Sequence, residues 1–358
     1  VTYDGNGQTS GSAPTDGNLY ANNTNYVVAS NTGNLSKGYA SFDNWNTLAN
    51  GSGTAVGAGT SRLIGTANVV LYAKYKYPNL SGVASSSDGV KLVSVADSTT
   101  DGNIWTSTDS GGTWTARATP RRWKCVASSS DGSKLVAGVW DGNIYTSTDS
   151  GLTWTARDSS RKWTSVASSA DGSKLIAAVN QDGFYVSADS GVTWNRVVTA
   201  NNAWVVTTSS DGARLLAGDT TASGLLRIST DSGANWNNST GGLGYWAASA
   251  SSSDGTKLYA IRDQIRTSSD SGSTWVARES TRQWGSITSS SDGTKAVAVV
   301  TNGQIFTSGD SGVNWTARDS SRAWTSVASS ADGSKLVATV SGGQIYTSTD
   351  SGVTWTAR

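Results

Sequence analysis

Short segments of strand length dominate the chain after residue 80, and turn residues separate them at regular intervals. One unit reads WTSVASSADGSKLIAAVNQDGFYVSADSGVTWNRV, and it holds four such segments: WTSVASS, KLIAAV, GFYVSAD and VTWNRV. An Asp-Gly turn follows the first segment, a variable loop the second and an Asp-Ser-Gly turn the third. Thr, Val, Trp and Tyr, which favour strands, are plentiful, whereas helix-favouring Glu and Met are scarce. The pattern predicts an all-β protein.

This unit occurs seven times. The Trp that follows each Asp-Ser-Gly turn marks it, and successive markers are 40, 40, 42, 39, 40 and 40 residues apart. Four antiparallel strands at this period are typical of the blades of a β-propeller. The first segment carries small residues (SVASS), the third Ile-Tyr or Ile-Phe and the fourth Trp, so we expect the first strand nearest a central axis. Packing between the first and seventh blades would then close the ring.

The marker belongs to a longer motif, Ser-x-Asp-x-Gly-x-x-Trp, with copies such as STDSGLTW and SGDSGVNW. It resembles the Asp-box of sialidase-type (BNR) propellers, and the resemblance covers roughly residues 80–358. In that family the box forms the hairpin between the third and fourth strands, where the Asp accepts backbone N–H groups, the Gly takes a positive φ and the Trp packs between strands. The resemblance implies a structural role for Asp109 and Trp114, Asp149 and Trp154, Asp189 and Trp194, Asp231 and Trp236, Asp270 and Trp275, Asp310 and Trp315, and Asp350 and Trp355.

Residues 1–77 lack the repeat. The pieces VTYDGNG, GYASFDNWNT, NGSGT and NVVLYAKYK resemble the Listeria–Bacteroides (internalin-B type) surface repeat, a small β-grasp-like module. Trp45 would be its core residue, and Asp4-Gly5-Asn6-Gly7 would form a turn. The resemblance implies an extracellular or cell-surface location. We therefore expect two domains, a β-grasp-like module over 1–77 and a seven-bladed Asp-box propeller over 78–358.

Charge and composition exclude several classes of function. The net charge of +1 gives no electrostatic reason to expect nucleic acid or an anionic membrane as partner. The chain has no histidine, which excludes a His-based triad or a His-ligated zinc site. Cys125, in WKCVASS, is a small strand residue where sister repeats carry Ser. Because the chain starts at Val1 and contains no methionine, we expect it to be processed or excised.

Catalysis has little support in the sequence. A sialidase needs an arginine triad, a tyrosine nucleophile and a glutamate, but Glu279 is the single glutamate and the arginines of the repeated TAR are periodic, as structural residues are. Glycosidases need only two carboxylates. Nearly all aspartates belong to the two repeated turns, and the remaining candidates lie in variable loops with no visible pairing, such as Asp97, Asp101, Asp141, Asp182, Asp219 and Asp263. We expect a non-enzyme without cofactor or metal, with a polysaccharide-acting glycoside hydrolase as the weakest alternative.

A binding face is the more plausible functional element. In a propeller, the loops from the fourth strand to the next blade and from the second to the third strand open on one face. Here the former hold paired Arg and Trp, a combination suited to sugars: Arg121 and Trp123, Arg161 and Trp163, Arg282 and Trp284, and Arg322 and Trp324. Trp recurs at this position in six blades, so the same residues could instead clamp adjacent blades.

Two functions stay open. The first is a structural or adhesive protein outside the cell, in which module and propeller form a rigid scaffold that contacts other subunits, as in a filament or surface layer. The second is a lectin that binds surface glycans through the Arg and Trp loops.

Overall fold

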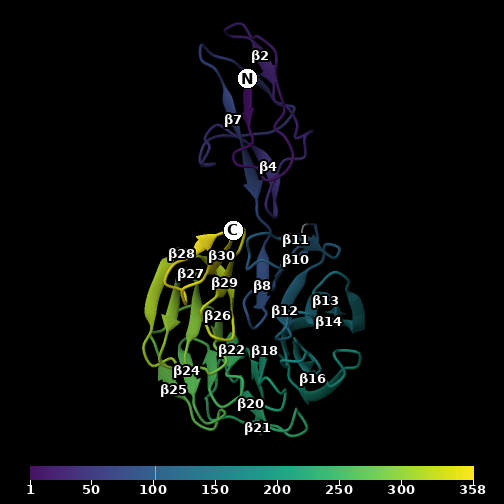
Figure 1. Ribbon diagram of the computed structural model, residues 1–358, viewed down its shortest axis with the longest axis vertical. Helices are drawn as coiled ribbons and strands as arrows, with labels where there is room; N and C mark the ends of the chain where they lie inside the picture. Colours follow the sequence, from purple (N-terminus) through teal and green to yellow (C-terminus); the bar gives the residue numbers. More distant parts are fainter. Residues whose placement is uncertain (101) are drawn as a thin grey trace. The chain divides into compact units, whose positions relative to one another are not determined.

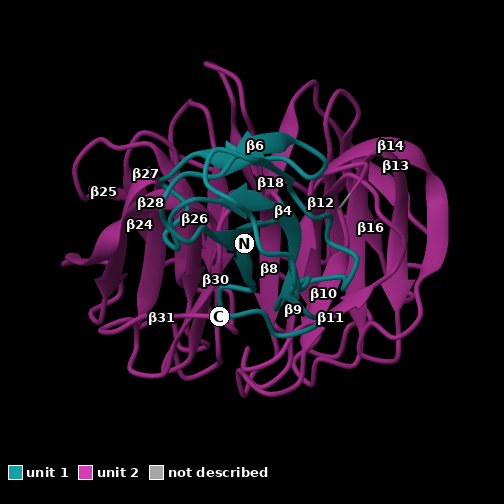
Figure 2. Cartoon of the chain, turned by 90° about the horizontal axis from the view of Figure 1, so that it is seen from above, with its two compact units in different colours: residues 1–78 teal, residues 79–358 magenta. Residues whose placement is uncertain are grey.

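The computed structural model describes residues 1–100 and 102–358, which form two compact units, Val1–Pro78 and Asn79–Arg358 (Figures 1 and 2). This division lies one residue after the expected boundary. The described ranges contain strands and turns but no helix, and therefore no helix that could cross a membrane. The predicted all-β class is confirmed.

Unit 1 contains a mixed sheet and a two-stranded ribbon. Its strands are β1 (Thr2–Asp4), β2 (Asn25–Val27), β3 (Ser36–Lys37), β4 (Ala40–Asn46), β5 (Ala55–Val56), β6 (Ser61–Leu63) and β7 (Val70–Lys76). The sheet has the order β1-β7-β4-β3, with β5 also paired to β4, and β2 pairs with β6. β1 runs parallel to β7, and the other pairs are antiparallel.

Trp45 is the centre of unit 1, as the sequence predicts. Its side chain is fully buried, packs at 4.8 Å from the ring of Tyr3, and donates its indole N–H to the carbonyl of Ala29 at 2.9 Å. The predicted turn is also present: the Asn6 N–H donates to Oδ1 of Asp4 at 2.7 Å, and Asn6 has a φ of 51°. Asn tolerates this left-handed conformation better than most residues.

Unit 2 is built from the repeated strands. They are β8 (Leu80–Ser85), β9 (Leu92–Ala96), β10 (Ile104–Ser107), β11 (Thr115–Arg117), β12 (Trp123–Ser128), β13 (Leu135–Ser147), β14 (Thr155–Ser168), β15 (Leu175–Val179), β16 (Gly183–Ser187), β17 (Asn195–Thr199), β18 (Ala203–Thr208), β19 (Leu215–Asp219), β20 (Leu226–Ser229), β21 (Asn237–Asn238), β22 (Ala248–Ser251), β23 (Leu258–Ile261), β24 (Ile265–Ser268), β25 (Val276–Arg278), β26 (Trp284–Ser289), β27 (Ala296–Ser308), β28 (Thr316–Ser329), β29 (Leu336–Val340), β30 (Ile345–Ser348) and β31 (Thr356–Ala357).

Within each repeat the strands pair in chain order and antiparallel, as in the sheet β11-β10-β9-β8. Some strands serve two positions: β13 and β27 continue from the second strand of a repeat into the third, and β14 and β28 continue from the fourth strand of one repeat into the first of the next. The chain therefore passes between neighbouring repeats without leaving strand geometry at these points.

The repeats form a closed ring around a channel. The Ser87 N–H donates to the carbonyl of Ser130 in the next repeat. In the same way, the N–H of each residue in the following series donates to the carbonyl of the next one, and Ala331 donates back to Ser87: Ser130, Ala170, Ser210, Ser253, Ser291 and Ala331. Each bond is 2.7 or 2.8 Å long. β8 contacts β12 on one side and β28 and β29 on the other (Figure 1). The expected packing between the first and last repeats is thus confirmed.

The Asp-Ser-Gly turn has the predicted mechanics. In the second repeat, Oδ1 of Asp149 accepts the Thr153 N–H at 2.9 Å, Gly151 has a φ of 85°, and the indole N–H of Trp154 donates to the Gly151 carbonyl at 3.1 Å. Ser147, which opens the motif, adds a further link: its hydroxyl donates to Asp149 at 2.7 Å and accepts the Gly151 N–H at 2.9 Å. The turn is therefore held by its own side chains.

Candidate binding face and central channel

The loops that enter the inner strands and the loops between second and third strands meet at one end of unit 2, which we call the loop face. Backbone bridges join the two kinds of loop, for example Asp97 with Arg122 and Thr220 with Tyr245. The same contact extends β13 and β14, where Gly142 pairs with Arg161. The predicted common face is present.

The four tryptophans that the sequence offers either to a ligand or to a clamp between repeats are buried. Trp123, Trp163 and Trp324 are 0% exposed and Trp284 is 4% exposed. Trp163 packs against Tyr185 and Trp194 of its own repeat, at 5.9 and 5.7 Å between ring centroids, and donates its indole N–H to Gly142 of the preceding repeat at 3.0 Å. A ring enclosed in this way cannot stack on a sugar. Of the two roles that the sequence leaves open for these tryptophans, their burial favours clamping of adjacent repeats over contact with a ligand.

Each clamp residue packs against a residue of complementary size in the preceding repeat. Ile or Leu at the start of a third strand shares a buried cluster with the Trp that follows: Ile104 with Trp123, Ile144 with Trp163, Leu226 with Trp246, Ile265 with Trp284, and Ile305 with Trp324. Between the third and fourth repeats the pair is reversed in size, because Phe184 packs with Ala203. A large residue on one side therefore offsets a small residue on the other.

The four arginines of the predicted site lie over aromatic rings of the third strands. The guanidinium carbon is 5.1 Å from the ring centroid for Arg121 over Tyr145, 4.7 Å for Arg161 over Tyr185, 4.7 Å for Arg282 over Phe306, and 4.5 Å for Arg322 over Tyr346. Three also pair with a carboxylate three residues earlier: Arg161 with Asp158, Arg282 with Glu279 and Arg322 with Asp319. Cation–π contacts and ion pairs thus fix most of these side chains within the fold.

Asp182 forms the densest charge network of this face. Its carboxylate accepts hydrogen bonds from Arg161 at 2.8 Å, Arg196 at 2.7 Å and the Tyr185 hydroxyl at 2.6 Å. Partial burial acts to raise the pKa of Asp182, but the hydrogen bonds from Tyr185 and Arg196 and the charge of Arg161 hold it below its usual value. Burial and the bond to Asp182 raise the pKa of Tyr185 to about 12. Both groups therefore keep one charge state near neutral pH.

Other loop carboxylates also have arginine partners. Asp97 pairs with Arg122, Asp219 with Arg227 and Asp263 with Arg262, at 2.8 to 3.0 Å. Asp141 is exposed, and Asp101 lies outside the described residues. A general acid needs a raised pKa, whereas the pKa of Asp182 is lowered. Among the described residues, no group of three or more His, Cys, Asp or Glu side chains could hold a metal ion.

One hollow on the loop face keeps its side chains accessible. It has a volume of about 890 Å³ and is lined by Tyr245, Arg262, Asp263, Arg282 and Gln283, together with Gly244 and Thr281. Tyr245 is 63% exposed, in contrast to the buried tryptophans. The loop of the fourth repeat that departs from the common pattern, NNSTGGLGYW, supplies this tyrosine.

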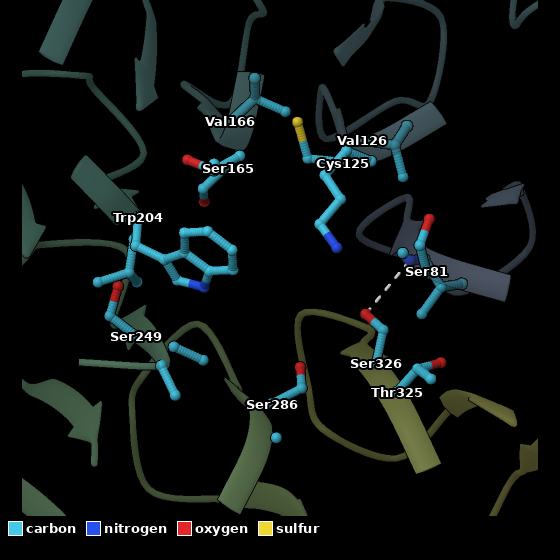
Figure 3. A pocket seen from close by; sticks show the side chains of 18 of the residues that line it. Ser81, Cys125, Val126, Ser165, Val166, Trp204, Ser249, Ser286, Thr325 and Ser326 are labelled. Carbon is cyan, nitrogen blue, oxygen red and sulfur yellow. Dashed lines mark hydrogen bonds between the residues drawn. The ribbon is translucent and has the colours of Figure 1, made fainter. Parts of the chain in front are cut away.

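The channel at the ring axis is the second candidate. Three consecutive residues of each inner strand line a cavity of about 320 Å³, among them Ser81, Ser165, Ser286 and Ser326 (Figure 3). Cys125 also lies on this wall, where burial raises the pKa of its thiol to about 12 and keeps it protonated. The expectation that small first-strand residues surround the axis is confirmed.

Two larger residues enter this channel, and the sequence interpretation missed both. Lys124 and Trp204 occupy the position that follows the clamp residue, where other repeats carry Ser81, Thr164, Ala247, Gly285 and Thr325. In the fourth repeat Ala203 occupies the clamp position, and Trp204 is the next residue along the strand. Because successive side chains of a strand point to opposite faces, Trp204 faces the channel and not the neighbouring repeat. Trp204 is therefore not the sixth clamp tryptophan that the sequence predicts. The sequence feature that could have revealed this shift is the dipeptide Ala203-Trp204, which stands where the preceding repeat has Trp163-Thr164.

Comparison with known proteins identifies the ring. No protein-family model matches the chain, and neither does any curated protein. Among solved structures, YCF48 from Cyanidioschyzon merolae is 17% identical, with a TM-score of 0.51 over 66% of this chain and 84% of that one. YCF48 bound to D1 peptide is 14% identical, with a TM-score of 0.57 over 77% and 94%. The fold of unit 2 is a β-propeller.

A glycoside hydrolase also resembles the chain more distantly. The GH74 xyloglucanase from Xanthomonas campestris is 16% identical, with a TM-score of 0.46 over 78% of this chain and 66% of that one. Because the identities to the YCF48 structures are below 25%, their likeness to this chain shows the fold alone.

Proposed function

We propose that the chain is a non-catalytic structural or adhesive protein outside the cell, in which a seven-bladed Asp-box propeller and a β-grasp-like surface-repeat module act as a rigid scaffold for contacts with other protein subunits. The observation that carries this proposal is the burial of the clamp tryptophans, because residues suited to a ligand are used to hold the ring together. The seven hydrogen bonds around the channel, one for each sequence repeat, support the blade count.

The loop carboxylates support the non-catalytic part of the proposal. Asp97, Asp182, Asp219 and Asp263 are each held in an ion pair with an arginine, and the pKa of Asp182 is lowered, whereas a proton donor for hydrolysis needs a raised pKa. The extracellular location rests on the resemblance of residues 1–77 to a surface repeat. Another propeller, YCF48, has been solved bound to D1 peptide, so a protein partner is compatible with this fold.

Assembly of the full chain tests the scaffold. We expect sedimentation velocity to show species that grow with protein concentration, and negative-stain microscopy to show repeating contacts that added sugars leave unchanged. A chain that stays monomeric at all concentrations and binds no protein from the source cell surface would overturn the proposal.

The hollow around Tyr245 favours a second function, a lectin. An exposed tyrosine beside Arg262, Arg282, Asp263 and Gln283 offers a stacking surface and hydrogen-bonding groups for a glycan. A glycan array should then show saturable binding that Tyr245→Ala and Arg282→Ala abolish. Binding that survives both substitutions would place the glycan elsewhere.

A further inference from the structure

Two departures from the repeat meet in the central channel. Lys124 of the second repeat and Trp204 of the fourth lie at the same strand position, one residue inside the start of the inner strand and therefore next to the loop face. The Lys124 ammonium lies 5.9 Å from the centroid of the Trp204 ring. Trp140 packs edge-on against Trp204, with the ring centroids 6.4 Å apart, and steadies the indole. Figure 3 shows Trp204 projecting into the cavity.

The channel wall around this pair supplies hydrogen-bond donors. The hydroxyl oxygens of Ser165, Ser286 and Ser326 accept backbone N–H groups of the next repeat at 3.3 to 3.4 Å. Each hydroxyl hydrogen therefore remains available to donate into the lumen. The Ser249 hydroxyl is buried and has no partner among the described residues.

The charge of the channel has one sign. Lys124 is the one charged residue among the described residues that line the cavity. No ion pair joins it to an acidic side chain in the described part of the chain. A channel lined by hydroxyl donors and one ammonium group is suited to an anion, because hydrogen bonds to charged groups are stronger than those between neutral groups.

We propose that this channel binds a sugar that carries a carboxylate, such as a hexuronate. Its carboxylate would pair with Lys124, its apolar C–H face would lie on Trp204, and its hydroxyls would accept from the serines. An aromatic carboxylate would match the indole but leave the hydroxyl wall without acceptors. The cavity of about 320 Å³ is at the small end of the roughly 300–1,000 Å³ of ligand pockets, which fits a single sugar ring. The site shares no lining residue with the hollow at Tyr245.

Calorimetric titration of the full chain with methyl glucuronide tests this proposal. We expect saturable binding with a Kd of about 1 mM or tighter. Methyl glucoside, which lacks the carboxylate, and acetate, which lacks the ring, should each bind at least about tenfold more weakly, because each lacks one of the two groups that the channel would hold. Saturation-transfer NMR should place the sugar C–H protons against the protein.

The variants Lys124→Ser and Trp204→Thr carry residues found at the same position in other repeats, so the ring should still form. Each should weaken glucuronide binding about tenfold or more, whereas Lys162→Ser should not, because Lys162 lies outside the lumen and bonds Gln181. Absence of saturable binding, equal affinity for glucoside, unchanged affinity in either channel variant, or tighter binding of N-acetyl-dialanine would each overturn the proposal. Assembly of the same variants, measured by sedimentation, reports on the scaffold separately.

Discussion

Gly151 shows at residue scale how the repeated turn also fixes the spacing between repeats. Its φ of 85° is in the left-handed region, which glycine adopts without steric cost. A Cβ added there would lie 2.9 Å from the Thr106 methyl group of the preceding repeat and 3.2 Å from Leu135. Glycine is therefore required twice, by the backbone conformation and by the neighbouring repeat.

We expect Gly151→Ala to destabilise the chain more than Gly242→Ala. Gly242 has a φ of 88° and nothing within 4 Å of an added Cβ, so its substitution carries only the backbone cost of about 1–2 kcal/mol. Gly151→Ala adds overpacking, which costs about 1–3 kcal/mol more. Urea unfolding followed by tryptophan fluorescence measures both free energies. Equal losses would show that the neighbouring repeat gives way freely.

The clamp tryptophans give a second comparison at this scale. Trp163 donates its indole N–H to Gly142, whereas the indole nitrogen of Trp123 has no partner among the described residues. Trp163→Phe should therefore lose about 1 kcal/mol more stability than Trp123→Phe, since it alone leaves a carbonyl without its donor. Chemical denaturation of the two variants checks the difference, and the reverse order would contradict the assigned bond.

The interface between the third and fourth repeats illustrates the element scale. Phe184 stands where other repeats have Ile or Leu, and Ala203 stands where most have Trp. The Phe184 ring also stacks near Trp236, at 6.5 Å between centroids. The interface is thus filled by the same pair of positions with their sizes exchanged.

A double-mutant cycle tests this exchange. Ala203→Trp alone should overpack the interface and cost about 1–3 kcal/mol or more. Phe184→Ile alone should leave a void and cost about 1 kcal/mol or more. The double variant should be more stable than the sum of the two losses implies, with a coupling free energy of about 0.5–3 kcal/mol. Additive losses would mean that the two side chains do not share one space.

The sequence predicts the elements better than it predicts the direction of their side chains. The period of the repeat, the Asp-Ser-Gly turn and the small inner-strand residues follow from local chemistry, and the structure has all three. Trp163 and Trp204 could not be told apart in the same way, because a Trp beside a loop can face solvent, a neighbouring strand or a channel. Only the register of the strand decides which way the side chain points. In the sequence, the single sign of that register is the shift of the Trp by one residue, from the position of Ala203 to that of Trp204.

At the scale of the whole molecule, carboxylates in the turns link stability to acid. Fourteen aspartates of the repeated turns have a pKa lowered by hydrogen bonds: Asp88, Asp109, Asp131, Asp149, Asp171, Asp189, Asp211, Asp231, Asp254, Asp270, Asp292, Asp310, Asp332 and Asp350. In Asp149 the bonds from Thr153 and Ser147 lower the pKa to about 2, from an ordinary 3.8. Because these aspartates are exposed to solvent, each one contributes little to the stability of the ring, but the fourteen contributions add up.

We therefore expect the melting temperature to be flat from about pH 8 to 5 and to fall between about pH 4 and 2. A depressed pKa adds stability above the unfolded value of 3.8, and protonation removes it as the pH falls through the folded value of about 2. The chain has no histidine, so no side chain with an ordinary pKa between 5 and 8 adds a transition there. Calorimetry across this range should show one acid transition that persists at 1 M NaCl, because hydrogen bonds rather than distant charges cause it. A fall that begins above pH 5 would contradict the lowered pKa values of the turn aspartates. A transition that disappears at high salt would instead assign the acid sensitivity to ion pairs such as those of Asp182 on the loop face.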